Sequence, residues 1–325
     1  DTGHDQSGGL FDASWASGRH DLIEDFGHRA LHLTTLNAKA ITEMFYTASP
    51  SFSYYTGCSK GGQMGLMEAQ KYPDDFDGII AGNPANDWTR FYAGAHLWYS
   101  KAMLEDQEAW IPRSKLPAFG SAVNAACDAI DGIQDGIIQN PLACNFEPAS
   151  IQCPVGIDNN SCLTQQQVTA VEKIWSGVET PNGELIYPGL VPGGEADTGG
   201  WGRWVTGAEP FTSLHWLGGE GFFRWFVFDD PEWDFRTFDF DKDLEYALEK
   251  VGDAVDSNDP DLRHLRDNGS KLIVYHGWSD PDISPVASIN YYESVINHIA
   301  DDMRAPNYDT ALSRTQNFFR LFMVP

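Results

Sequence analysis

The chain has 325 residues, 42% of them hydrophobic, which is enough to bury a large core in one big domain with an insertion or in two domains. Its 47 acidic and 21 basic residues give a net charge of −26, so we expect neither nucleic acid nor an anionic membrane as a partner. No apolar run in the sequence approaches the length of a membrane span.

The first 58 residues contain one apparent amphipathic helix, at 25–46, and room for one or two strands. The chain also begins without a methionine. We therefore expect further sequence before residue 1.

A G-x-S-x-G pattern follows, formed by Gly57, Ser59 and Gly61. The aromatic, strand-like segment 51–56 precedes it, and the helix-forming segment 61–72, which ends before Pro73, follows it. Strand, glycine turn and helix form the arrangement that lifts a serine oxygen clear of the backbone. We predict that Ser59 is a nucleophile, the alternative being a Gly-Ser loop between core elements.

The middle of the chain, residues 87–257, is irregular, and eight of the 11 tryptophans lie in a Trp-rich region within it, from Trp98 to Trp233. We predict a lid domain here, inserted into an α/β-hydrolase domain made of 1–86 and 258–325. Stacked aromatics in a lid could receive a phenolic acyl group, although most of them are expected to be packing residues.

Four of the five cysteines lie in this region, and we pair Cys127 with Cys144 and Cys153 with Cys162 because both loops are then short. Cys58, next to Ser59, is left unpaired. Disulfides and two sequons, at 159–161 and 268–270, predict a secreted glycoprotein.

The loop between Cys127 and Cys144 crowds three aspartates together, and a hard cation would relieve their repulsion. The pattern is not that of an EF-hand, because Gln139 stands where a closing glutamate is needed. The expected calcium ligands are Asp128, Asp131 and Asp135 with the carbonyls of Ile133 and Ile137. A pair of Asp-Gly turns on an acidic surface explains the spacing equally well.

Residues 271–275 read as a buried parallel strand, and Asp280 lies in the loop after it, where the acid of a catalytic triad usually stands. Asp282 is the near competitor, and a turn aspartate before Pro281 is the structural alternative. Of the histidines, only His298 lies beyond this loop, in an apparent helix, and His276 is too close to Asp280 to be the base. Because the last residues, 318–325, read as another strand, we expect the catalytic histidine after Pro325.

The chain resembles the tannase and feruloyl esterase family in segments spread over nearly its whole length: "DTGH", "DFGHRALH", "GCSKGGQMGLMEAQKYPDDFDGIIAGNPA", "CDAIDGIQDGI", "FVFDDPEWDF" and "KLIVYHGWSDPDISPVASINYYESV". The resemblance implies an α/β-hydrolase fold with a large lid, a Ser-Asp-His triad and one structural calcium. It makes Ser59 the nucleophile, Asp280 the acid and the Lys60 N–H an oxyanion donor, and it supports the five calcium ligands named above. It also implies that Cys58 bonds to a cysteine directly after the catalytic histidine.

The family's histidine-cysteine pair and its second oxyanion loop are absent from residues 1–325, and Lys60 replaces a small or acidic residue. The expected function is hydrolysis of phenolic acid esters, most of all feruloyl esters of plant cell-wall polysaccharides, with tannase as the alternative. A non-catalytic, calcium-stabilised binding module is the rival from another class, and a glycosidase is a third reading without a clear carboxylate pair.

Overall fold

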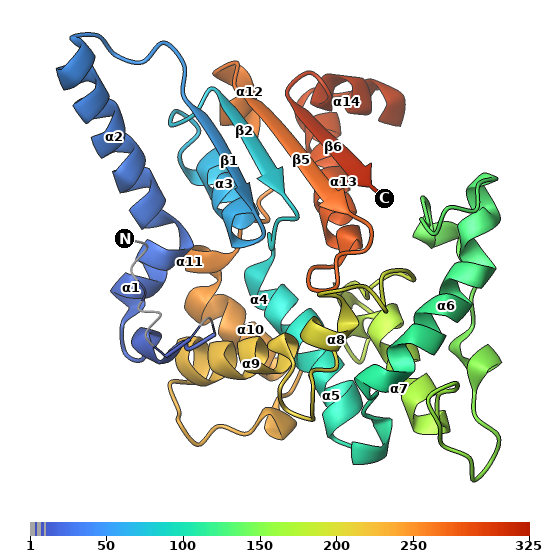
Figure 1. The fold of residues 1–325 in the computed structure, drawn as a ribbon. Coiled ribbons are helices and arrows are strands. Elements are labelled where there is room, and N and C mark those ends of the chain that lie inside the picture. The colour runs from blue at the N-terminus through green and yellow to red at the C-terminus, as the bar shows by residue number, and fades with distance from the viewer. Residues whose placement is uncertain (1–3, 5–7, 10) are drawn as a thin grey trace.

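Four parallel strands form the central sheet. The computed structural model, which describes residue 4, residues 8–9 and residues 11–325, orders these strands β1-β2-β5-β6. Their bounds are Tyr54–Cys58 for β1, Gly78–Gly82 for β2, Lys271–Gly277 for β5 and Phe319–Val324 for β6. Because all four strands are parallel, their carboxyl ends meet at one edge, which faces the helical part of the molecule (Figure 1).

The segments predicted around the sheet form as expected. The predicted helix at 25–46 is part of a continuous helical stretch made of α1 (His20–Glu24), one π-helical turn and α2 (Ala30–Tyr46). The strand and helix on either side of Ser59 are β1 and α3 (Lys60–Lys71), and α3 ends before Pro73 because proline cannot continue a helix.

Only one face of the sheet is covered by helices of the described residues. On that face α3 packs against β1 and β2, and α13 (Pro285–Asp302) packs against β5 and β6. On the other face Ile80, Ile273 and Phe322 are 42%, 37% and 50% exposed. The apolar run at 271–275, predicted to be buried on both sides, is therefore buried in alternation, at Leu272 and Val274.

The chain between β2 and β5 forms a helical layer at the carboxyl edge of the sheet (Figure 1). It contains the two-stranded sheet of β3 (Val178–Glu179) and β4 (Leu185–Tyr187). Its helices are α4 (Trp88–Phe91), α5 (Tyr99–Leu104), α6 (Leu116–Cys127), α7 (Gln165–Ser176), α8 (Trp201–Trp204), α9 (Leu214–Gly221), α10 (Lys242–Ala247) and α11 (Asp253–Val255). The helix just before β5, α12 (Arg263–Asp267), instead contacts α3 and contributes to the core of the sheet. The last helix, α14 (Tyr308–Thr315), packs against α13.

Two hydrophobic cores correspond to these layers. One lies between the sheet and the helices that cover it, and it is built from residues of α3, β2, β5, α13 and their neighbours. The other lies within the helical layer and also includes Ala16 and Ile23, which precede the sheet in the chain. The start of the chain thus packs on the predicted lid, and the exact domain boundaries, 86/87 and 257/258, stay predictions.

Candidate active site

Ser59 lies on a strained turn between β1 and α3. Its backbone angles are φ 61° and ψ −119°, a left-handed conformation that costs a non-glycine residue on the order of 1–3 kcal/mol. The surrounding contacts hold it there, because its N–H donates to the Gly82 carbonyl (2.9 Å) and its carbonyl accepts from the Gln63 N–H (3.1 Å). The turn is the geometry predicted for a nucleophile elbow.

The neighbouring glycines allow this turn to be tight. A Cβ at Gly57 would lie 2.6 Å from the carbonyl oxygen of Gly61, and a Cβ at Gly62 would lie 2.4 Å from that of Gly82. Both distances are shorter than a carbon and an oxygen can approach. The small residues around Ser59 are therefore required by the close approach of α3 to β1 and β2.

Asp280 lies in the loop after β5, and backbone and side-chain donors fix its carboxylate. Oδ1 accepts the N–H groups of Asp282 (2.9 Å) and Ile283 (3.0 Å), and Oδ2 accepts Asn83 Nδ2 (2.6 Å). Asn83 follows β2 at φ 40°, a conformation that asparagine tolerates better than most residues. Three hydrogen bonds orient the carboxylate in the way that a triad acid requires.

The end of β2 links the two predicted catalytic residues. Gly82 accepts the N–H of Ser59, and the next residue, Asn83, donates to Asp280. Since β1 and β5 are the two neighbours of β2, Ser59 and Asp280 leave the sheet at the same edge, one strand apart. The structure thus places both residues where the α/β-hydrolase arrangement needs them.

Asp282, the competing acid, belongs to a buried cluster that the sequence did not predict. Its Oδ1 lies 3.1 Å from Nε2 of His96 and 3.3 Å from Nε2 of His215. Burial raises the pKa of the Asp282 carboxyl, but the two imidazoles outweigh it and the net pKa is below the usual value. Because both of its neighbours are histidines of the helical layer, Asp282 joins that layer to the acid loop.

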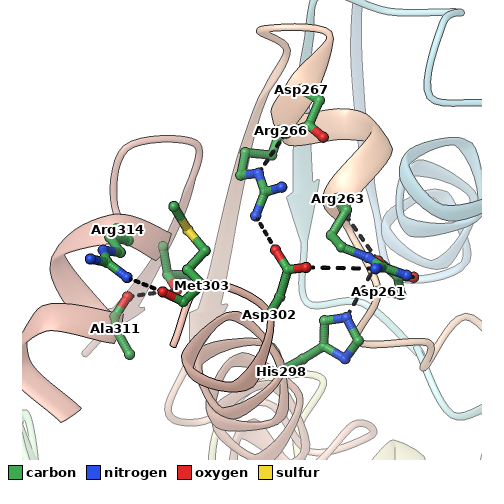
Figure 2. A network of polar contacts seen from close by, with 10 residues as sticks. Asp261, Arg263, Arg266, Asp267, His298, Asp302, Met303, Ala311 and Arg314 are labelled. Carbon is green, nitrogen blue, oxygen red and sulfur yellow. Dashed lines mark hydrogen bonds and ion pairs between the residues drawn. The ribbon is translucent and has the colours of Figure 1, made fainter. Parts of the chain in front are cut away.

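Neither of the histidines considered as bases contacts Ser59. His276 is buried, with Nδ1 2.8 Å from Ser288 Oγ and Nε2 3.1 Å from the Ile283 carbonyl oxygen, so it supports the loop after β5. His298 lies on α13, 3.4 Å from Asp261, in a surface network of arginines and aspartates (Figure 2). In the described part of the chain, no imidazole is hydrogen-bonded to Ser59.

An aromatic pocket of about 370 Å³ opens beside Ser59 and Lys60. Among the described residues, the acidic and imidazole side chains on its wall are those of Asp12, Asp282, His4 and His96. The aromatic side chains that line it are Phe11, Trp15, Phe26, Trp88, Phe91, Tyr92, Trp204, Phe222 and Phe226. Trp204 is the one tryptophan of the predicted Trp-rich region among them, while Trp15 and Trp88 come from outside that region.

Lys60 contributes both its backbone and its side chain to this pocket. Its N–H is the first of α3, and the first N–H groups of a helix have no acceptor within the helix, so it is free to serve as the predicted oxyanion donor. Its Nζ donates to Gln63 Oε1 (2.5 Å). Burial lowers the pKa of Lys60 to about 7.

The predicted disulfides form, and the loop between Cys127 and Cys144 is a series of aspartate turns. Cys127 is bonded to Cys144 and Cys153 to Cys162, while Cys58 is free and exposed. Within the loop, Oδ1 of Asp128 accepts the N–H of Asp135 (3.2 Å). Among the described residues, the acidic and histidine side chains whose ligand atoms converge within 4.8 Å are His96, His215 and Asp282, and His32, Glu68 and Asp75. The loop's aspartates are in neither group. They offer the oxygen ligands that calcium prefers, but their carboxylates do not meet this distance criterion.

The parallel sheet, the serine on its strained turn and the carboxylate after β5 define an α/β-hydrolase fold with a large inserted helical layer. The sequence profile described as "Tannase and feruloyl esterase" matches residues 1–325, and the chain belongs to this family.

Relatives and solved structures agree with this assignment. The chain is 37% identical over 336 residues to an uncharacterized esterase from Xanthomonas campestris pv. campestris, covering 100% of this chain and 58% of that protein. It is 31% identical over 305 residues to feruloyl esterase B from Aspergillus niger, covering 94% and 55%. The crystal structure of an esterase from Aspergillus oryzae superposes with a TM-score of 0.84 at 30% identity, covering 97% of this chain and 59% of that one. The chain thus spans a little over half the length of these proteins.

Proposed function

We propose that this chain carries the nucleophile, the acid and the acyl-binding pocket of a carboxylic ester hydrolase that acts on phenolic acid esters. The observation that carries the proposal is the position of Ser59, on a strained turn that opens into an aromatic pocket. A phenolic ring is flat and apolar with a polar edge, and aromatic walls bind such a group well. Feruloyl esters are the preferred substrates because relatives that cover most of this chain are named feruloyl esterases.

The reaction would proceed by acyl transfer to the serine. Ser59 Oγ would attack the ester carbonyl, and the Lys60 N–H would donate to the oxygen on which negative charge develops. The alcohol would leave, and water would then release the phenolic acid. Asp280 would orient the imidazole of the base, which remains the histidine predicted after Pro325. The end of β6 supports this assignment, since Val324 accepts the Trp278 N–H (2.7 Å) and β6 therefore reaches the edge that carries Asp280.

Hydrolysis of methyl ferulate and methyl gallate by the full-length protein tests this function. We expect a higher kcat/KM on the ferulate, and Ser59→Ala should abolish turnover of both esters. A preference for the gallate would instead identify a tannase. Labelling with a serine-directed phosphonate, mapped to Ser59 by mass spectrometry, separates an esterase from a non-catalytic module, because a module would leave Ser59 unmodified.

We propose as well that the loop between Cys127 and Cys144 binds one structural calcium ion. Its aspartates and the carbonyls of Ile133 and Ile137 are the hard oxygen donors that calcium prefers. Gly132 and Gly136, at φ 93° and 85°, supply the turns that a short loop needs to wrap around an ion. Calcium should raise the Tm of the wild-type protein relative to EGTA, and Asp135→Asn should reduce that shift. An equal Tm in calcium and in EGTA would show that the loop binds no calcium and is only a pair of Asp-Gly turns.

The same protein is proposed to be secreted and glycosylated. Both disulfides belong to an oxidising compartment. The sequon asparagines, Asn159 and Asn268, are exposed and so accessible to a glycosyltransferase. None of the helices in the described ranges is long and apolar enough to cross a bilayer.

A further inference from the structure

The Lys60 side chain places its amine against two aromatic rings next to Ser59. Its Nζ lies 4.2 Å from the ring centroid of Phe26 and 5.1 Å from that of Trp88, and both rings line the pocket that Ser59 lines. Rings attract a cation through their faces, but they do not replace the water that a free ammonium group holds. Burial lowers the pKa of the Lys60 amine.

No carboxylate among the described residues forms an ion pair with Lys60. The two carboxylates on the pocket wall are engaged elsewhere, because Asp12 accepts the Ser14 N–H (3.0 Å) and Asp282 lies between two histidines. The acceptor that Lys60 does have is the neutral amide oxygen of Gln63. An ammonium group has three donors, so two of them remain for a ligand.

The amide of Gln63 is itself held in place, which fixes the position of the lysine. Gln63 Nε2 donates to the carbonyl oxygens of Val255 (2.8 Å) and Gly27 (3.3 Å). The amide oxygen must therefore point toward Lys60. Because Gln63 is fully buried, this arrangement is rigid, and it keeps the Lys60 Nζ at the pocket wall in the absence of substrate.

We propose that the Lys60 side chain binds a ring oxygen of the aromatic acyl group and so selects esters of ring-hydroxylated aromatic acids. This inference rests on the proposed ester-hydrolase function. The pocket wall supplies apolar contact to the ring, and Lys60 supplies the hydrogen bond to the ring substituent. A site built to bind a hydroxyl discriminates strongly against the analogue that lacks it, since the buried donor is then left without an acceptor.

The test compares kcat/KM for methyl 4-hydroxycinnamate and methyl cinnamate in the full-length wild-type protein and in its Lys60→Met variant. We expect the wild type to prefer the hydroxylated ester by at least about tenfold, as a hydrogen bond to a charged group implies. Lys60→Met should reduce this ratio to near one. Because the ratio compares two substrates in one protein, it is insensitive to a change in basal turnover. Lys71→Met is the matched control: it lies on the same helix, outside the pocket, where Lys71 pairs with Asp253 (2.9 Å).

A binding measurement covers the case in which Lys60→Met loses turnover. Calorimetry measures the affinity of Ser59→Ala protein, with and without Lys60→Met, for 4-hydroxycinnamate and cinnamate. The Ser59→Ala protein should bind 4-hydroxycinnamate about tenfold more tightly, and Lys60→Met should remove this difference. An unchanged preference in Lys60→Met, in either experiment, would overturn the proposal. If the wild type hydrolyses neither ester, the proposed function itself fails, and a hydroxyl preference in binding would then still assign Lys60 as the recognition group.

Discussion

The strain at Ser59 predicts that glycine at this position makes the protein more stable and inactive. Ser59 adopts φ 61° and ψ −119°, which costs a non-glycine residue about 1–3 kcal/mol. Glycine accepts this conformation freely but loses about 0.5–1 kcal/mol more backbone entropy on folding. Ser59→Gly should therefore raise the free energy of unfolding by about 1 kcal/mol.

Ser59→Ala is the control, because alanine removes the hydroxyl and keeps the strained backbone. Ser59 is exposed, so the loss of Oγ leaves no buried group unpaired and the stability should stay close to wild type. Denaturant unfolding of the three proteins, followed by circular dichroism, measures the difference, and an ester assay should find both variants inactive. A glycine variant no more stable than the alanine variant would show that the turn stores no strain.

Three further predictions concern the surroundings of the nucleophile. Asn83→Gly keeps the positive φ but removes the donor to Asp280, so kcat should fall about tenfold to a hundredfold, as for one hydrogen bond to a charged group; steady-state kinetics showing a wild-type kcat would contradict this. Burial lowers the Lys60 pKa to about 7, so the folded chain binds fewer protons than the unfolded chain between pH 7 and about 10, and its stability should rise across this window. Lys60→Met should accordingly be stabilising by up to about 4 kcal/mol below pH 7, with the gain shrinking toward pH 10 in unfolding titrations; a gain that does not depend on pH would contradict it. Gly62→Ala, whose Cβ would lie 2.4 Å from a backbone carbonyl at the end of β2, should cost about 1–3 kcal/mol, whereas Gly61→Ala, with its nearest atom at 3.6 Å, should be tolerated; equal Tm values for the two would refute the packing argument.

The sheet and its turn could be predicted because their signals are local. Glycines at 57 and 61 and a helix ended by Pro73 identify the turn at Ser59 within about 20 residues of sequence, and an apolar run followed by a loop locates Asp280. These patterns do not show which neighbouring elements cover each strand. The apolar run at 271–275 predicts a strand that is buried on both faces, yet Ile273 is partly exposed. An apolar run does not show which of the two faces a neighbouring layer covers, so this exposure could not be predicted.

The helical layer could not be predicted in the same way, because its contacts are long-range. His96, His215 and Asp282 meet in space from three separate segments, and no spacing in the sequence connects them. Trp15 and Trp88 line the pocket although they lie outside the Trp-rich region at 98–233, because the start of the chain and the segment after β2 both pack on the core of the helical layer. Composition located the aromatic residues, but only the tertiary structure separates pocket wall from core.

The residues at the end of β2 explain how Ser59 and Asp280 keep their relative positions without a direct contact between them. Gly82 receives the Ser59 N–H, the Asn83 N–H donates to the Tyr275 carbonyl (2.8 Å), and the Asn83 side chain holds Asp280. One dipeptide thus ties the turn after β1 to the loop after β5, and the width of one strand sets their separation. A group that bridges the two must enter at this edge, where β6 also ends beside Trp278. Any residue that follows β6 directly would therefore arrive next to Asp280, which is the position that the base of the proposed Ser-Asp-His triad has to occupy.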